Sequence, residues 1–302
     1  MSNYKVIFVN WTKPFFHRKD AEGYNKLKMS NHTSNEYSMV KYELELTKIA
    51  IKSAKKYTNQ IIKLYTDDIG FEYYKKENLL ELFDEIDVDT LNQYNKEEVN
   101  AGKFWTSGKS IAMGNEPAPY LFLDNDFILQ SKIPNHLLNG DLCVTHWEIQ
   151  RGDFFATNEM VNNLGFKIRN FNQNMLMPNT SFVFMNNDLL RKNYLDSHLD
   201  IINQNHRKIP EWLWLLSDQG ILGYEARNLD LNVNSIENQI YLSFWESYEI
   251  ENSCGFTPMW IGQDNEDDKL KYYHVWFDKF RMKTDWKWRG EKIEELHSIL
   301  KK

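Results

Sequence analysis

The chain has 302 residues, of which 42% are hydrophobic, and a formal net charge of −7. This length is enough for one large core or for two modest domains. The acidic balance argues against non-specific nucleic-acid binding as the main activity. No apolar run approaches the roughly 18 residues of a membrane-spanning helix, and we expect neither a membrane span nor a signal peptide. The two cysteines, Cys143 and Cys254, indicate a reducing cytosol, so a cytoplasmic location is expected.

Strand-like and helix-like segments alternate along the first part of the chain. The elements expected there are strands at residues 5–9, 60–65 and 83–88 and helices at residues 37–57, 71–78 and 104–113. Residues 18–35 lack periodicity and are expected to be irregular. Strands and helices that alternate at this spacing predict a parallel sheet with right-handed crossovers.

The next strand-like run is interrupted by two carboxylates. Pro119 to Leu129 is apolar except around Asp124 and Asp126. Side chains two residues apart in an extended chain point the same way, so these carboxylates are expected to project together, at or just past the end of a buried strand. Two converging carboxylates need a counter-charge, and a divalent cation with oxygen ligands would supply it. The alternative is a surface turn with two solvated aspartates.

No linker, repeat or low-complexity segment divides the chain, so we expect a single domain over residues 1–302. Residues 1–129 have the pattern of a nucleotide-binding α/β half. The elements expected in the second half are strands at residues 142–145, 179–185 and 272–276 and helices at residues 188–194, 212–226 and 292–301.

Three short motifs follow the two aspartates in order. Asn179–Ser181 opens a strand, Ser217–Gln219 lies in a helix with an apolar face, and His274 lies in an aromatic strand near the C-terminus. Together with the aspartates they resemble the glycosyltransferase A fold, and in particular the retaining enzymes of glycosyltransferase family 8. That family has a YLDxD-type strand, a strand segment of N-A/S-G type, a DQxxLN helix and a late histidine in an HFxGxxKPW-type segment. The match covers most of the chain, although each motif is short and degenerate.

The resemblance implies a mixed, mostly parallel α/β sheet flanked by helices, and transfer of a sugar from a nucleotide-diphosphate donor to a hydroxyl acceptor. Asp124, Asp126 and His274 would bind Mn²⁺ or Mg²⁺, and Asp218 and Gln219 would be the catalytic pair near the reacting carbon. Residues 130–302 would bind the acceptor and complete the metal site. The residues that would bind the donor are Thr66, Asp67, Lys109, Asp124, Asn179, Ser181 and Lys279.

Two departures from the family pattern affect these expectations. The chain continues from His274 as Val-Trp-Phe-Asp-Lys, so Lys279, Lys283 or Trp286 would have to replace the family's lysine and tryptophan at the donor phosphate. Asn179–Ser181 also lacks the usual glycine, which changes the geometry expected on the acceptor side.

The chemistry of these residue types agrees with sugar transfer. A divalent metal would neutralise the charge of a departing diphosphate, and one imidazole with two carboxylates suits Mn²⁺ somewhat better than Mg²⁺. A retaining transfer needs no strong base on the enzyme if the leaving phosphate oxygen takes the acceptor proton, which fits the neutral amide of Gln219. An inverting transfer would need a carboxylate base, for which Asp218 or Asp153 is available. The residues leave both routes open, and the resemblance favours retention.

Each residue also has a structural alternative. His274 could be a hydrogen-bonded core histidine, Asp218 and Gln219 an exposed helix corner, and Asp67 a strand-end turn or a helix cap. His146, Trp147 and Arg151 follow a strand and could touch the donor or the acceptor.

Other functions remain open as well. A glycan is the simplest acceptor, with a protein side chain or a hydroxylated base of phage-type DNA as alternatives; strongly salt-dependent acceptor binding would favour DNA. A sugar-nucleotide nucleotidyltransferase would need a Gly-rich first loop, which Asn10–Pro14 is not. A non-catalytic sugar- or nucleotide-binding module is the third class.

Overall fold

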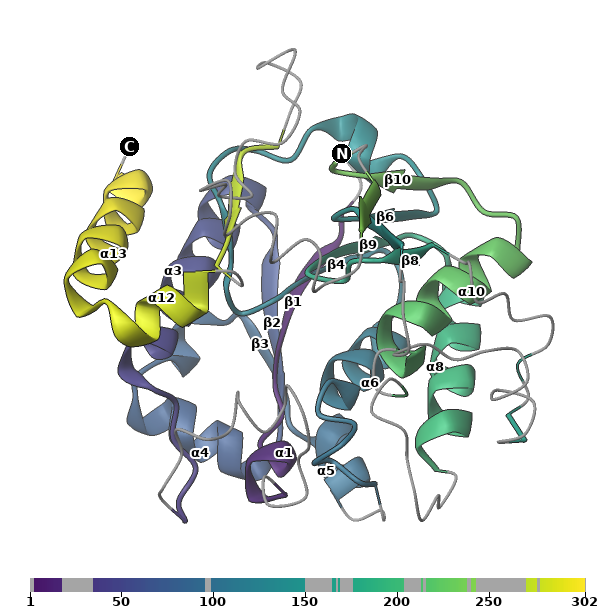
Figure 1. Ribbon diagram of the computed structural model, residues 1–302, viewed down its shortest axis with the longest axis horizontal. Coiled ribbons are helices and arrows are strands. Elements are labelled where there is room, and N and C mark those ends of the chain that lie inside the picture. Colours follow the sequence, from purple (N-terminus) through teal and green to yellow (C-terminus); the bar gives the residue numbers. More distant parts are fainter. Residues whose placement is uncertain are drawn as a thin grey trace.

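Figure 1 shows the computed structural model of the chain. The structure describes residues 3–17, 35–95, 99–149, 165–166, 168, 176–203, 213, 216–237, 240–242, 270–275 and 278–301. Within these ranges, the side chains of residues 149, 240–242 and 278–280 are not described. The segment expected to be irregular, residues 18–35, lies outside the described residues except for its last position.

A seven-stranded sheet in the order β10-β6-β9-β4-β1-β2-β3 forms the centre of the fold. Its strands are β1 (Lys5–Asn10), β2 (Ile61–Thr66), β3 (Glu85–Asp87), β4 (Tyr120–Leu123), β6 (Leu142–Val144), β9 (Phe182–Met185) and β10 (Val233–Ser235). β1 is parallel to β2 and β4, β2 is parallel to β3, and β6 is parallel to β10. β9 alone runs antiparallel to both of its neighbours, β4 and β6. The predicted α/β class with a mixed, mostly parallel sheet is therefore confirmed.

Two small sheets extend this centre. β5 (Phe127–Leu129) pairs antiparallel with β12 (Tyr272–His274), and this pairing sets His274 opposite Phe127. A second sheet joins β11 (Ile240–Leu242), β7 (Trp147–Ile149) and β8 (Met177–Pro178). The β5–β12 pairing joins segments that lie far apart in the sequence.

Helices cover both faces of the central sheet (Figure 1). The longer ones are α3 (Lys41–Thr58), α4 (Asp68–Lys76), α6 (Ser107–Asn115), α8 (Asp188–Ile202), α10 (Ile221–Asn228) and α13 (Trp286–Lys301). Shorter elements are α1 (Lys13–Phe16), α5 (Asp89–Asn95), α12 (Asp278–Thr284), the 3₁₀ turns Leu80–Leu82 and Asn135–Leu138, and a π-helical turn at Leu216–Gly220. α3, α12 and α13 lie on one side of the sheet, and α6, α8 and α10 lie on the other.

The apolar strands are buried on both sides because both faces are covered. In β1, Val6 and Phe8 pack into the cluster formed with α3, whereas Ile7 packs into the cluster formed with α6, α8 and α10. All three side chains are fully buried. This explains why the strand has a continuous apolar run instead of an alternating pattern.

Some helix boundaries differ from the sequence-based expectations. α4 begins at Asp68 instead of Phe71, because the side chain of Asp67 accepts a hydrogen bond of 2.9 Å from the backbone of Gly70 and caps the helix. The helix expected at residues 212–226 contains the π-helical turn, and residues 211–212 and 214–215 lie outside the described part.

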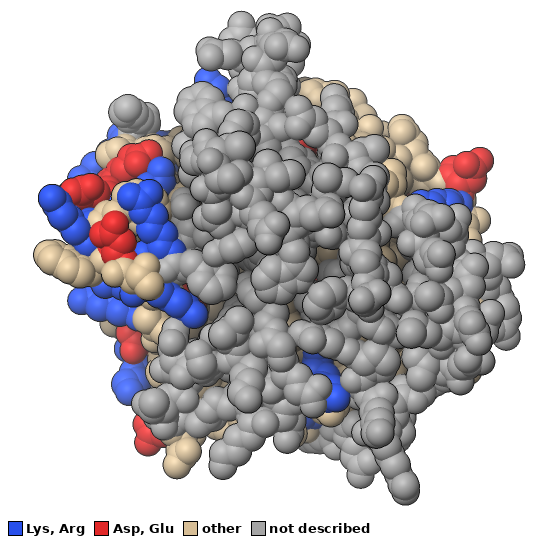
Figure 2. All heavy atoms as spheres, in the orientation of Figure 1, with Lys and Arg blue, Asp and Glu red and all other residues tan. Residues whose placement is uncertain are grey.

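Charged side chains of both signs lie on part of the outer surface. On the face in Figure 2, Lys and Arg side chains lie intermixed with Asp and Glu over α12 and α13.

Among the helices of the described ranges, none has the length and apolar character required to cross a membrane.

Candidate active site

The motif residues meet at one edge of the central sheet. β1 and β4 are parallel, so their carboxyl ends, at Asn10 and Leu123, lie at the same edge. β9 runs the other way, and its first residue, Phe182, pairs with Leu123. Asn179–Ser181, which precede β9, therefore lie beside Asp124–Asp126, which follow β4. Ligands bind at this edge in open α/β sheets.

Asp124 and Asp126 converge through a tight turn and not through the pleat of a strand. The backbone amide of Phe127 donates to the carbonyl of Asp124 at 2.9 Å, and this closes the turn. The side-chain amide of Asn125 donates to the carbonyl of Val9 at 2.8 Å, which ties the turn to the end of β1. The chain then resumes as β5, which belongs to a different sheet. The two aspartates do follow the end of a buried strand, as expected, since β4 ends at Leu123. Their side chains come together through the turn, however, and not through the alternation of an extended chain.

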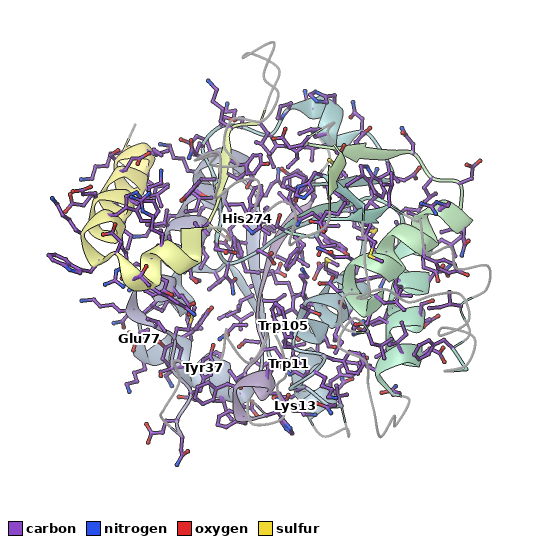
Figure 3. All side chains as sticks on the ribbon, viewed as in Figure 1. Trp11, Lys13, Tyr37, Glu77, Trp105 and His274 are labelled. Atoms are coloured by element: carbon purple, nitrogen blue, oxygen red, sulfur yellow. The ribbon has the colours of Figure 1, made fainter. Side chains whose placement is uncertain are left out.

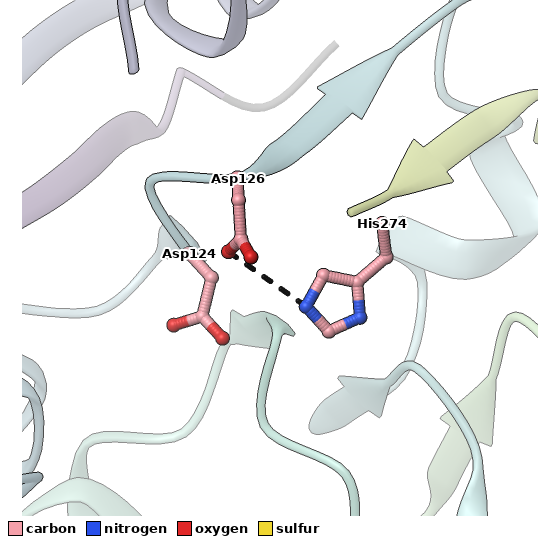
Figure 4. A group of neighbouring side chains, drawn as sticks. All are labelled: Asp124, Asp126 and His274. Carbon is pink, nitrogen blue, oxygen red and sulfur yellow. Dashed lines mark ion pairs between the residues drawn. The ribbon is translucent and has the colours of Figure 1, made fainter. Parts of the chain in front are cut away.

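His274 completes this cluster (Figure 4). Its Nε2 lies 3.8 Å from Oδ1 of Asp126, and one ligand atom of each of Asp124, Asp126 and His274 lies within 4.8 Å of the others. The position of His274 follows from the backbone, because β12 pairs with β5 and the amide of Val275 donates to the carbonyl of Asp126 at 3.1 Å. Figure 3 shows His274 near the middle of the molecule. Two carboxylates and one imidazole this close fit a single divalent cation.

Lys109, near the start of α6, lies next to this cluster. Its Nζ is 3.1 Å from Oδ2 of Asp218 and 3.8 Å from Oδ1 of Asp124, and it donates to the hydroxyl of Thr180 at 2.8 Å. Burial lowers the pKa of Lys109, but the charges of Asp124 and Asp218 outweigh it, so the pKa lies above its usual value. The side chain is therefore an ammonium group at neutral pH.

Asp218 is buried and held by several donors. Besides Lys109, the hydroxyls of Thr180 and Tyr194 donate to its Oδ1 at 3.3 and 3.4 Å. Asp218 and Gln219 lie in the π-helical turn, a rare conformation that often occurs at functional sites. The ring of His198 reaches this turn from α8, with Nδ1 2.6 Å from the carbonyl oxygen of Ser217. Since a carbonyl can only accept, Nδ1 carries the proton.

Gln219 follows Asp218 in this turn. Its Oε1 is buried and has no hydrogen-bond partner in the described part of the structure. Such an unsatisfied acceptor costs free energy in the folded protein, and functional sites are one place where it persists. A hydroxyl group of a bound ligand would satisfy it.

Asn179 and Ser181 belong to a hydrogen-bond network that includes an unpredicted carboxylate. The side chain of Asn179 accepts from the hydroxyl of Ser181 at 2.7 Å and donates to Oε1 of Glu148 at 3.0 Å. The same Oε1 lies 3.0 Å from Nε2 of His146. Burial raises the pKa of Glu148, but the contacts with His146 and Asn179 lower it more, so Glu148 is anionic. Its Trp-Glu-Ile context carries no motif, so no local pattern marks it as a site residue.

Thr66 and Asp67 are fully buried at the end of β2 and serve local structure. The Thr66 hydroxyl donates to the carbonyl of Asn10 at 2.8 Å. Asp67 caps α4 and accepts from the backbone amide of Thr12 at 2.9 Å and from the Thr12 hydroxyl. The alternative interpretation of Asp67 as a helix cap is confirmed. A role for either residue in donor binding stays a prediction.

Three candidates fall outside what the structure describes, and a fourth packs against the core. Arg151 and Asp153 lie outside the described residues. Lys279 lies in α12, but its side chain is not among those described. Trp147 lies in β7 and packs against the core cluster of α6, α8 and α10.

No protein-family model and no curated protein matches this sequence. The solved structures with a distant likeness include the following three. Mouse xyloside xylosyltransferase 1 (apo form) aligns over 91% of this chain and 98% of its own, with 14% identity and a TM-score of 0.43. The PaToxG glycosyltransferase aligns over 75% and 69%, with 10% identity and a TM-score of 0.38. A nucleoside-diphosphate-sugar pyrophosphorylase of Vibrio cholerae aligns over 78% and 91%, with 12% identity and a TM-score of 0.36. Likenesses at these scores do not assign a function, so the function has to be inferred from the residues of the site.

Proposed function

We propose that this chain is a metal-dependent glycosyltransferase that moves a sugar from a nucleotide-diphosphate donor to a hydroxyl acceptor. The observation that carries the proposal is the cluster of Asp124, Asp126 and His274 at the carboxyl edge of the sheet, with the ammonium group of Lys109 beside it. A Mn²⁺ or Mg²⁺ ion held by the cluster would act as a Lewis acid toward the departing diphosphate. The Lys109 ammonium would stabilise charge on the same phosphates.

The contacts of Asp218 favour a retaining transfer. A general base needs a carboxylate that can take a proton, yet the Asp218 carboxylate is paired with Lys109 at 3.1 Å and accepts from two hydroxyls. In a retaining reaction the leaving phosphate oxygen would take the acceptor proton. Asp218 would then hold Lys109 in place, and the Gln219 Oε1 would accept a hydrogen bond from the sugar or the acceptor.

The acceptor and the cellular location are proposed from the sequence. A glycan is the favoured acceptor, with a hydroxylated base of phage-type DNA as the alternative, and the cysteine usage favours a cytosolic enzyme. Cys143, the cysteine among the described residues, is buried and not in a disulfide. Donor binding by Thr66, Asp67, Asn179, Ser181 and Lys279 belongs to the same proposal.

A turnover assay tests the proposal. Purified protein is incubated with a panel of nucleotide sugars and Mn²⁺, and released nucleoside diphosphate is measured, because water can replace the acceptor slowly. We expect one donor to be consumed, with the rate lost in Asp126→Asn and His274→Gln and kept in Asp188→Asn, whose side chain is 55% exposed on α8. Donor binding without turnover, in the presence of varied acceptors, would indicate a binding module. Pyrophosphate release from a nucleoside triphosphate and a sugar phosphate would indicate a nucleotidyltransferase.

A further inference from the structure

One lysine is shared between two carboxylates with different surroundings. Lys109 Nζ lies 3.1 Å from Oδ2 of Asp218, whose side chain is 2% exposed, and 3.8 Å from Oδ1 of Asp124, whose side chain is 30% exposed. The first contact is a hydrogen-bonded ion pair and the second is an attraction between charges at longer range. Thr180 accepts from Lys109 and donates to Asp218, so it supports the pair on both sides.

The charges of the three carboxylates and the lysine around this position favour binding of a metal before a diphosphate. The carboxylates of Asp124, Asp126 and Asp218 and the ammonium of Lys109 carry a combined formal charge of −2. A divalent cation brings the group to neutrality, and a diphosphate then meets no excess negative charge. Without Lys109, the metal-loaded group would still be negative and would repel a diphosphate. With Lys109, the metal itself meets a nearby like charge.

We propose that Lys109 couples the two ligands: it weakens metal binding while the diphosphate is absent and strengthens diphosphate binding once the metal is present. The proposal rests on the proposed function, because it takes Asp124 and Asp126 as metal ligands. Asp218 is a positioning residue in this scheme, since it holds Lys109 away from a closer pairing with Asp124. The two residues therefore act on metal affinity in opposite directions.

Calorimetric titration of the whole chain with Mn²⁺ alone tests the coupling without any assay of activity. Lys109→Met removes the like charge, and we expect it to bind Mn²⁺ at least about tenfold more tightly than the wild type. Asp218→Asn frees Lys109 to pair with Asp124, and we expect Mn²⁺ binding at least about tenfold weaker. A purely structural role for the pair predicts that both variants bind Mn²⁺ more weakly or that neither changes, and either result overturns the proposal.

Lys63→Met is the matched control. The Lys63 side chain is 14% exposed, like the 15% of Lys109, and it pairs with the buried carboxylate of Glu116 at 2.7 Å. Glu116 also lies 3.8 Å from Nζ of Lys5, the first residue of β1, so this pair belongs to the opposite edge of the sheet. We expect its Mn²⁺ affinity to equal that of the wild type.

A second titration uses inorganic pyrophosphate at saturating Mn²⁺. We expect Lys109→Met to bind pyrophosphate at least about tenfold more weakly than the wild type, and equal affinity would overturn the coupling. If Lys109→Met does not fold, as judged by its thermal melt, the weaker Mn²⁺ binding expected of Asp218→Asn still tests the coupling. A wild type that binds no Mn²⁺ contradicts the proposed function itself, whereas a wild type that binds Mn²⁺ with unshifted variants contradicts the coupling alone.

Discussion

His198 should make the folded protein sensitive to mild acid. The ring is fully buried, and burial lowers its pKa from 6.5 to about 4. In the unfolded chain the same histidine titrates near 6.5. Between these two pH values the unfolded chain binds a proton that the folded protein does not bind, so the free energy of unfolding falls as the pH falls. The stability associated with the uncharged ring is fully present above about pH 6.5 and is lost by about pH 4. A pKa difference of this size between the folded and the unfolded chain corresponds to about 3 kcal/mol in the free energy of unfolding.

Urea denaturation of wild type and His198→Asn at pH values from 4 to 7.5 measures this contribution. Asparagine does not titrate, and its amide can still donate toward the carbonyl of Ser217, which His198 contacts at 2.6 Å. We expect the wild type to be the more stable protein at pH 7.5, with its advantage over the variant reduced by about 3 kcal/mol at pH 4. His136→Asn, which changes an exposed histidine, should keep the pH dependence of the wild type. A stability difference between wild type and His198→Asn that is the same at both pH values would show that burial does not lower the pKa of His198.

Further predictions concern two glycines and one helix cap. A Cβ added at Gly70 would lie 2.2 Å from Oγ1 of Thr66, so Gly70→Ala should lower the free energy of unfolding by about 1–3 kcal/mol. Gly290→Ala, where a Cβ meets nothing within 4 Å in the described structure, should raise it by up to about 1 kcal/mol because alanine favours the helix. Urea denaturation measures both, and equal effects would contradict the packing account. Asp67→Ala removes the cap of α4 and the hydrogen bonds from Thr12, and should cost at least about 2 kcal/mol in the same assay; an unchanged midpoint would show that these bonds do not matter.

The sheet could be predicted from the sequence because its signals are local. Continuous apolar runs such as Lys5–Val9 and Tyr120–Leu123 are typical of strands buried on both faces, and both form strands of the central sheet. The predicted helix starts are less accurate. α4 begins three residues before the predicted position because the Asp67 side chain caps it there. The π-helical turn at Leu216–Gly220 has no sequence signature that separates it from an α-helix, so it was expected as part of one.

The site was predictable only in part, because its members come together through long-range pairing. Spacing within the chain suggested that Asp124 and Asp126 converge, but it could not bring His274 to them; the β5–β12 pairing does so. The resemblance to a known family supplied that contact as an expectation. Glu148 had no motif around it, and its position beside Asn179 and His146 becomes visible only in the folded chain.

If the proposed function is correct, Asp124, Asp126 and His274 hold a metal that in turn binds a nucleotide sugar. The most direct test is a thermal-shift panel of nucleoside diphosphates and their sugars, with and without Mn²⁺, on the wild type and on Asp126→Ala. A ligand at 100 times its Kd stabilises the folded state by about 2.7 kcal/mol, which is easily measured as a higher midpoint. We expect one nucleotide sugar to stabilise the wild type only when Mn²⁺ is present, and we expect Asp126→Ala to lose this response. If no nucleotide raises the midpoint of the wild type under any metal condition, the cluster is a turn with a neighbouring histidine and the proposed function is wrong.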